Sequence, residues 1–153
     1  MELEITKITS EYESVDLRPS IDFANLLNNV LSNIKMCHWY AIDYNLHVIS
    51  GNLYEDLSDK FDELQEQIIG VIKSNSVMFP IFNVSQGVEN MPESYDHVER
   101  LLFYIKLISS VLSSLAMKHF VEDCGPNGIN NTIEEILSSI NKSLYLIGML
   151  NLD

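Results

Sequence analysis

The sequence lacks long apolar runs, paired cysteines and a secretory signal. No apolar stretch approaches the ~18 residues of a membrane-spanning helix, and the first residues lack the basic start and apolar core of a signal peptide. Cys37 and Cys124 are its two cysteines, and neither belongs to a CxxC pair. Isolated cysteines of this kind are typical of reduced thiols in the cytosol. These absences predict a cytoplasmic protein without a membrane segment.

Positive charge is also scarce. Nine Lys and Arg residues stand against 22 acidic ones, the net charge is −13, and no two basic residues are neighbours. Nucleic-acid binding requires basic groups that replace the counterions of phosphates, so the composition predicts no binding to DNA or RNA. The GxGxxG, P-loop and Gly-x-Ser-x-Gly patterns are absent as well. What remains is one globular domain with 46% hydrophobic residues in 153.

Apolar residues recur three or four apart along four stretches, which predicts an all-α fold. The expected helices cover about residues 20–41, 44–73, 94–123 and 132–150. Their starts are marked by Pro19-Ser20, by Asp43 as an N-cap, by Glu93-Ser94, and by a capping box of Thr132 with Glu135. Residues 1–18 are expected to form an acidic N-terminal tail outside the bundle.

The connections between these helices indicate how they are arranged. The first and second helices are joined by a short link, as are the third and fourth, whereas residues 74–92 form a long connection with a packed apolar segment, Val77–Phe82. A long crossover between the second and third helices is typical of ferritin-like bundles. We therefore expect residues 19–153 to form a ferritin-like four-helix bundle.

Four residues form the candidate metal site: His38, His47, Asp62 and Glu66. Imidazole and carboxylate together suit iron, manganese or zinc. On one helix, Asp62 and Glu66 lie about 40° apart and one turn apart, so they can share an ion. His47 points to nearly the same side but lies ~22 Å away along the axis. The histidines and carboxylates can therefore meet only if a second copy packs antiparallel, which gives two equivalent sites per two-fold dimer.

A simpler interpretation stays open beside this one. Two carboxylates four apart on an acidic helix often form a solvated face, and a histidine near Trp39 is often a packed residue with satisfied hydrogen bonds. His97 and His119 have no spaced partner and receive no role. Gly51 inside the second helix costs about 1 kcal/mol relative to alanine, so we expect a reason for it, such as close packing or a kink.

The run His38-Trp39, Leu46-His47, Tyr54–Leu57 and Phe61–Ile68 resembles the Dps-like mini-ferritins, the DNA-protecting proteins of starved bacteria. Asp62 and Glu66 keep that family's spacings of fifteen and nineteen residues after His47, and Thr132–Ile147 is similar to its last helix. The resemblance implies a hollow dodecamer that oxidises ferrous iron with peroxide or oxygen and stores the ferric mineral. It implies iron at two-fold interfaces, with His38, His47, Asp62 and Glu66 as ligands from both subunits.

The sequence departs from that family's pattern at two points. The family acid four residues after the second histidine falls on Gly51, for which Glu55 or Asp59 could substitute, and His38 and His47 are nine residues apart instead of the usual twelve. The lysine-rich tail with which the family commonly binds DNA is replaced here by an acidic one, so DNA binding is predicted absent. Two functions follow: an iron-oxidising mini-ferritin, or a ferritin-like interaction protein with an inactive site.

Overall fold

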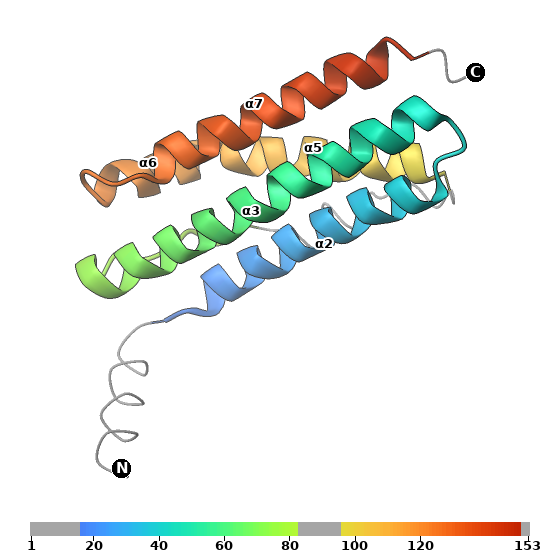
Figure 1. Cartoon of the computed structure of the whole chain (residues 1–153). Coiled ribbons are helices and arrows are strands. Elements are labelled where there is room, and N and C mark those ends of the chain that lie inside the picture. The colour runs from blue at the N-terminus through green and yellow to red at the C-terminus, as the bar shows by residue number, and fades with distance from the viewer. Residues whose placement is uncertain (1–15, 83–95, 151–153) are drawn as a thin grey trace.

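The computed structural model describes residues 16–82 and 96–150, all of whose regular structure is helical (Figure 1). The predicted acidic tail lies mostly outside these residues. The five helices of these described residues are α2 (Arg18–Tyr40), α3 (Tyr44–Asn75), α5 (His97–Leu112), α6 (Leu115–Asp123) and α7 (Ile129–Gly148). The all-α prediction is confirmed.

The first two predicted helices are confirmed as α2 and α3. Pro19 lies in the first turn of α2, where its missing N–H costs nothing. Asp43 caps α3 as expected, since its Oδ1 accepts a hydrogen bond from the Leu46 N–H at 2.9 Å. Only residues 41–43 separate the two helices, so α3 folds back along α2 as an antiparallel neighbour.

The third predicted helix is not continuous, and this part of the prediction was wrong. Its expected start at Glu93-Ser94 lies outside the described residues. The chain leaves the helix at Ser113, and Ser114 starts α6 by accepting a hydrogen bond from the Met117 N–H on its Oγ at 3.2 Å. A serine at an N-cap satisfies one of the free N–H groups of a new helix, and here it allows a bend of 45° between α5 and α6.

The capping box predicted at Thr132 was also wrong. The last helix, α7, begins three residues earlier, where Asn127 Oδ1 accepts a hydrogen bond from the Ile129 N–H at 2.8 Å. Thr132 is buried inside α7, and its hydroxyl donates to Gln67 Oε1 on α3 at 2.9 Å. A tertiary contact therefore replaces the local cap that the sequence suggested.

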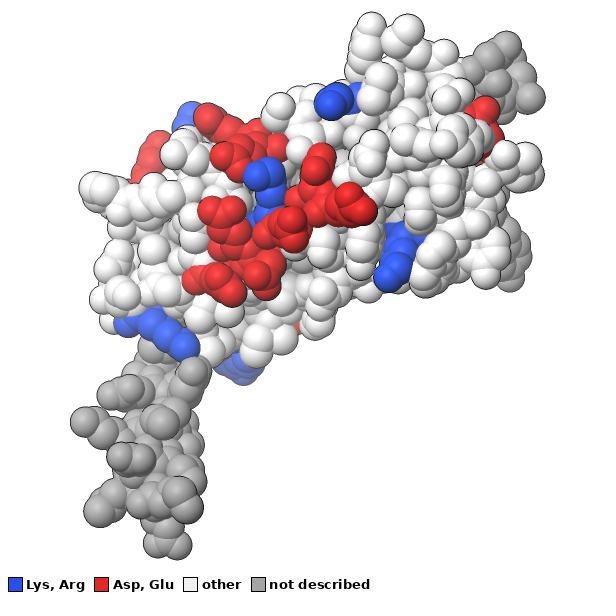
Figure 2. All heavy atoms as spheres, viewed as in Figure 1, with Lys and Arg blue, Asp and Glu red and all other residues white. Residues whose placement is uncertain are grey.

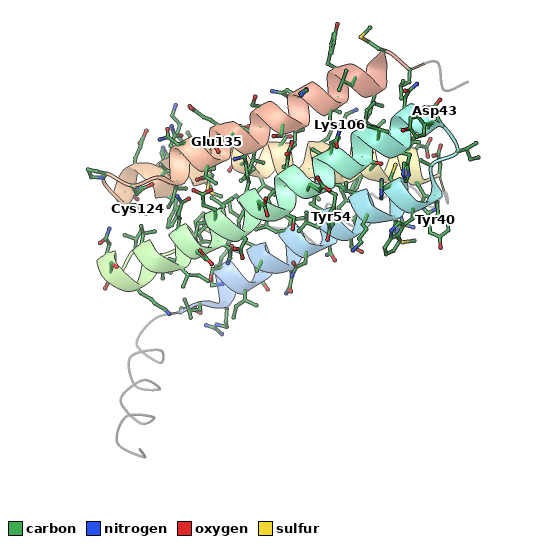
Figure 3. The ribbon with its side chains drawn as sticks, viewed as in Figure 1. Tyr40, Asp43, Tyr54, Lys106, Cys124 and Glu135 are labelled. Atoms are coloured by element: carbon green, nitrogen blue, oxygen red, sulfur yellow. The ribbon has the colours of Figure 1, made fainter. Side chains whose placement is uncertain are left out.

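The helices form a bundle in which α2 packs on α3 and α5, and α7 packs on α3 and α5. Tyr40 stacks on His97 with ring centroids 5.2 Å apart, so the end of α2 and the start of α5 meet at one end of the bundle. Asp43, before α3, lies at that same end, whereas Cys124, after α6, lies at the other (Figure 3). The neighbours α2 and α3 are antiparallel, while α3 and α5 run in the same direction. The end of α3 and the start of α5 therefore lie at opposite ends of the bundle, as the predicted long connection requires.

The core is built from one apolar stripe of each helix. The stripe of α3 recurs every three or four residues, as the sequence predicted; its buried members are Leu46, Leu53, Leu57, Phe61, Leu64, Ile68 and Ile72. Phe79 follows α3 and closes one end of the core against Phe23 and Phe120, with ring centroids 5.2 and 5.0 Å apart. Burying such a ring contributes about 1.5–3 kcal/mol. The prediction that Val77–Phe82 packs is confirmed for Phe79, while Met78 and Ile81 remain exposed.

A helix that spans a membrane must be both long and apolar. Across residues 16–82 and 96–150, no single helix meets both requirements. The bent pair of α5 and α6 meets them only when the two helices are taken together.

Candidate functional site

The structure brings His38 and His47 into direct contact. His38 lies in the last turn of α2 and His47 in the first turn of α3, so the tight link at residues 41–43 places them face to face. Their rings stack with centroids 4.0 Å apart and planes 18° apart. Each Nδ1 also bonds to the backbone of the other residue: His38 Nδ1 lies 2.8 Å from His47 O, and His47 Nδ1 lies 2.7 Å from His38 O.

These crossed hydrogen bonds determine which ring nitrogen carries the proton. A carbonyl oxygen only accepts, so Nδ1 must donate on both His38 and His47. In the neutral rings the lone pair is then left on Nε2, which has no hydrogen-bond partner among the residues that the structure describes. A backbone carbonyl that holds one ring nitrogen and leaves the other to a ligand is the usual surrounding of a metal-binding histidine.

Gly51 lies directly beneath the ring of His38. A Cβ atom added at Gly51 would lie 2.8 Å from both Cε1 and Nδ1 of that ring, closer than real Cβ contacts allow. His38 therefore occupies the space into which a side chain at position 51 would extend. The close packing suggested by a glycine in mid-helix is confirmed, and its partner is His38. No carboxylate can stand at this position while the ring remains where it is.

A hollow of about 430 Å³ opens between α2 and α3 beside these residues. We call it the histidine hollow; it is lined by Lys35, His38, Trp39, Tyr44, His47, Val48, Gly51, Asn52, Tyr54 and Glu55. The Lys35 ammonium lies 5.1 Å from the ring centroid of Trp39 and 5.0 Å from that of Tyr54, so it makes cation–π contacts with both. Both histidines thus border one open, aromatic-walled surface.

Asp62 and Glu66 lie exposed on α3, one turn apart, as the helix periodicity predicted. Asp62 lies fifteen positions after His47 on α3, which corresponds to ~22 Å along the helix axis. In the described parts of this single chain, no group of three or more His, Cys, Asp and Glu side chains could hold a metal ion. The four predicted ligands therefore form two separate pairs within one copy of the chain.

Asp62 borders a second hollow, farther along the same groove between α2 and α3. This carboxylate hollow has a volume of about 440 Å³ and is lined by Ala24, Leu27, Asn28, Leu31, Ser58, Asp59, Phe61, Asp62 and Gln65. Gln65 donates its amide hydrogen to Ser20 O at 3.1 Å, but its Oε1 is buried without a hydrogen-bond partner in the described structure. Of the two substitute acids considered above, Glu55 borders the histidine hollow and Asp59 the carboxylate hollow.

Cys37 beside His38 is not an activated nucleophile. Its side chain is fully buried, and this burial, with the nearby charge of Asp96, raises the pKa of the thiol to about 11 despite an opposing hydrogen bond with Ser50. Burial likewise raises the pKa of Cys124. Both cysteines are therefore protonated structural residues at neutral pH.

Acidic side chains gather on the outer face of α3 and α7 (Figure 2). The exposed members are Glu55, Asp56, Asp59, Asp62, Glu63 and Glu66 of α3 and Glu134 and Glu135 of α7. Lys60 lies among them and forms an ion pair with Glu135, which joins the two helices. Nearby carboxylates raise the pKa of Lys60, the Glu135 contact most of all. This field favours cations at the surface near Asp62 and Glu66.

Two features of this region could not be identified from the sequence. Neither the hollows nor the contact of Gly51 with His38 has a linear signature, because both depend on how α2 packs against α3. The sequence feature that pointed to this contact was Gly51 itself, which lies four residues after His47 on the same helix face.

Comparison of the chain with protein-family models, with curated proteins and with solved structures gave no match.

Proposed function

We propose that this chain is a ferritin-like protein, of the kind represented by the Dps-like mini-ferritins, that binds and oxidises ferrous iron between two antiparallel copies. In each site, His38 and His47 of one copy face Asp62 and Glu66 of the other. Each pair then supplies what the other lacks: two neutral nitrogen donors on one side and two carboxylates on the other. Nitrogen and oxygen donors of this kind suit ferrous iron.

The observation that carries this proposal is the pair of crossed hydrogen bonds between His38 and His47. They hold both rings by Nδ1 and leave both Nε2 atoms without a hydrogen bond in the described structure, and both residues line the histidine hollow. The parallel course of α3 and α5, separated by a long connection, supports the ferritin-like arrangement. The acidic face near Asp62 would raise the local concentration of ferrous ions.

The reaction expected at such a site is a simple electron transfer from iron. Two ferrous ions each lose one electron, and one hydrogen peroxide molecule takes up both electrons with two protons to give two molecules of water. The chain's residues bind and orient the ferrous ions, while the carboxylates stabilise the higher charge of the ferric product. Iron is thus the substrate and the stored cargo, and a dodecameric shell would hold the mineral.

A second candidate is favoured by one specific contact. The ring of His38 fills the place of a side chain at Gly51, so the carboxylate that the mini-ferritins carry there has no room. A site with one ligand fewer could bind iron without oxidising it or lose the metal altogether. The protein would then be a ferritin-like bundle that acts by binding a partner, with His38 and His47 serving only to join α2 to α3.

Anaerobic titration with Fe(II), followed by hydrogen peroxide and measurement of the ferric absorbance, separates these two functions. We expect the wild type to bind and oxidise iron, and the variants His47→Ala and Asp62→Ala to lose both properties. Glu134→Ala is the matched control, because Glu134 is an exposed acid on α7 outside the proposed site. If the wild type oxidises iron no faster than the Asp62→Ala variant, the iron-oxidising function is wrong.

A further inference from the structure

The link between α6 and α7 contains the dipeptide Asn127-Gly128, and the sequence has no second Asn-Gly pair. The link follows Cys124 at the end of the bundle opposite Asp43 (Figure 3), and none of its residues lines either hollow. Asn127 is half-buried and Gly128 is exposed, so water reaches the pair. A glycine after an asparagine has no side chain that would hinder its backbone nitrogen from attacking the asparagine side chain.

Hydrogen bonds at both ends of its amide hold the side chain of Asn127. The Oδ1 atom accepts from the Ile129 N–H, the first N–H of α7, at 2.8 Å. The Nδ2 atom donates to Gly125 O at 2.6 Å and to Val121 O at 3.5 Å. The contact with Ile129 polarises the side-chain carbonyl, and the N-terminal end of a helix favours negative charge. The fold therefore makes Cγ of Asn127 a better electrophile.

The backbone nitrogen of Gly128 is the nucleophile next to this carbonyl. Its N–H donates to no acceptor among the residues that the structure describes, so no hydrogen bond has to break before it reacts. Gly128 also lies just before the first residue of α7, outside the regular hydrogen-bond ladder of the helix. Glycine changes its backbone angles at less cost than other residues, so the nitrogen can turn toward the side chain of Asn127.

We propose that Asn127 is a modification site, at which the native protein converts to aspartate and isoaspartate. The Gly128 nitrogen loses its proton to water and bonds to Cγ of Asn127, while the charge that develops on Oδ1 faces the Ile129 N–H. The bond from Cγ to Nδ2 then breaks, and the side-chain nitrogen takes up a proton and leaves as ammonia. Water opens the resulting cyclic imide: cleavage between Gly128 N and Cγ gives aspartate, and cleavage between Gly128 N and the backbone carbonyl carbon of residue 127 gives isoaspartate.

Isoaspartate disturbs the start of α7, because it leads the chain through Cγ and lengthens the backbone between residue 127 and Gly128. The carbonyl oxygen of Gly128 accepts from both the N–H and the hydroxyl of Thr132, each at 3.2 Å. A Cβ atom at Gly128 would lie 2.7 Å from Gln67 Nε2, so this glycine packs directly on a side chain of α3. A displaced Gly128 therefore weakens both the first turn of α7 and its contact with α3.

Aspartate at the same position has a milder effect. Its carboxylate still accepts from the Ile129 N–H, and a negative charge is favourable at the start of a helix. Only the donors to Gly125 O and Val121 O are lost. Of the two products, aspartate thus keeps the cap of α7 and isoaspartate removes it. The modification depends neither on the proposed iron chemistry nor on the association of two copies.

Ageing of the folded full-length protein at mildly alkaline pH, followed by peptide mass spectrometry, tests the chemistry. Each conversion appears as the mass gain from NH2 to OH, and methyl transfer by an isoaspartate methyltransferase identifies the isoaspartate fraction. We expect Asn127 to convert before every other asparagine of the chain. Asn75 is the matched internal control: its Nδ2 also donates to a carbonyl, Cys124 O at 3.0 Å, but a serine follows it. The variant Asn127→Ser has no side-chain amide and should gain no mass at this position.

Hydrogen exchange of the aged protein tests the effect on α7. Peptides that contain isoaspartate separate from unmodified ones by chromatography, so the amides of the first turn of α7 can be followed in each form. We expect these amides to exchange about 5-fold or more faster in the isoaspartate form, which is the effect of losing a helix cap. The variant Asn127→Asp keeps the cap and should exchange like the unmodified protein.

Three results would overturn the inference. It is wrong if Asn127 keeps its mass in the folded protein while the urea-unfolded chain converts there, because the native hydrogen bonds would then block the reaction. It is equally wrong if Asn75 converts first, or if isoaspartate leaves the exchange of the first turn of α7 unchanged. A protein that converts at Asn127 but never oxidises iron would refute the proposed function alone, and iron oxidation by a chain that never converts would refute this inference alone.

Discussion

The ring of His38 lies so close to the backbone of Gly51 that a Cβ atom there would approach its Cε1 and Nδ1 to 2.8 Å. This contact connects two unusual features of the chain, the glycine within the first third of α3 and the short interval between His38 and His47. Because the helices turn back after only residues 41–43, the end of α2 lies against the start of α3, and the imidazole needs the space of a side chain at position 51.

The first prediction concerns the two glycines of α3. Gly51→Ala should destabilise the fold by about 1–3 kcal/mol, because the new methyl group overlaps the His38 ring. Gly70→Ala is the matched control: nothing lies within 4 Å of its Cβ position, so a gain of about 0.5–1 kcal/mol in helix propensity is expected. Chemical denaturation measures both. Equal effects of the two substitutions would mean that His38 does not press on Gly51.

A rescue variant extends this prediction. If the cost of Gly51→Ala arises from the His38 ring, it should largely disappear in a background that carries His38→Ala, since the methyl group then has room. The two substitutions should therefore be non-additive by about 1 kcal/mol or more, as expected for residues in contact. If the losses of stability are additive, the cost of Gly51→Ala does not come from the His38 ring.

The second prediction concerns the protonation of the two histidines. Both rings should carry their hydrogen on Nδ1 in the neutral state, because each Nδ1 faces a carbonyl oxygen. Long-range proton–nitrogen NMR spectra of the metal-free protein at pH 8 distinguish the two tautomers directly. In free solution histidine favours the Nε2–H form, so the unfolded protein provides the reference. A hydrogen on Nε2 of either residue would contradict the crossed hydrogen bonds.

The third prediction concerns the contact between α3 and α7. Thr132→Val keeps the shape of the buried side chain but removes the hydroxyl that donates to Gln67 Oε1, so a loss of about 1–2 kcal/mol is expected. Thr132→Ser retains the hydroxyl and should recover most of this contribution, apart from the missing methyl group. If valine is tolerated as well as serine, the hydrogen bond with Gln67 does not stabilise the bundle.

The fourth prediction concerns alkaline pH. The pKa of Cys37 is raised in the folded state from 9.0 to about 11, chiefly by burial, so folding favours the neutral thiol. The resulting contribution to the free energy of unfolding is fully present below pH about 9 and is lost as the pH rises toward about 11. Denaturation between pH 8 and 10.5 should show a fall in stability that is steeper in the wild type than in Cys37→Ala. If stability falls equally steeply with pH in the two proteins, the buried thiol of Cys37 does not cause the loss.

The sequence predicted the helices well where one local signal agreed with the apolar pattern. Asp43 is both the last residue before the periodic stretch of α3 and its observed cap. Prediction of the helices from the sequence failed where two local signals competed. Ser113-Ser114 was interpreted as part of a continuous helix, although a serine can equally cap a new one, and Thr132 was interpreted as a cap although its hydroxyl finds Gln67 instead.

The candidate site was predictable only in part, for a geometric reason. Helical periodicity placed Asp62 and Glu66 together and His47 far from them, and the structure agrees. The contact between His38 and His47 depends on the turn at residues 41–43, whose conformation no periodic pattern encodes. The acceptor of Gln65 without a hydrogen-bond partner and the two hollows arise from packing between α2 and α3, which no pattern in the sequence encodes.

The most direct test of a shared site mixes two inactive variants. His47→Ala and Asp62→Ala are each expected to bind no ferrous iron, because every site in either homodimer lacks one ligand. After the two proteins are unfolded and refolded together, each hybrid dimer has one site with all its ligands, so about a quarter of the wild-type iron should bind. The binding measured by anaerobic titration should then appear only in the mixture. A mixture that binds no more iron than the separate variants would contradict a metal site built from two copies of this chain.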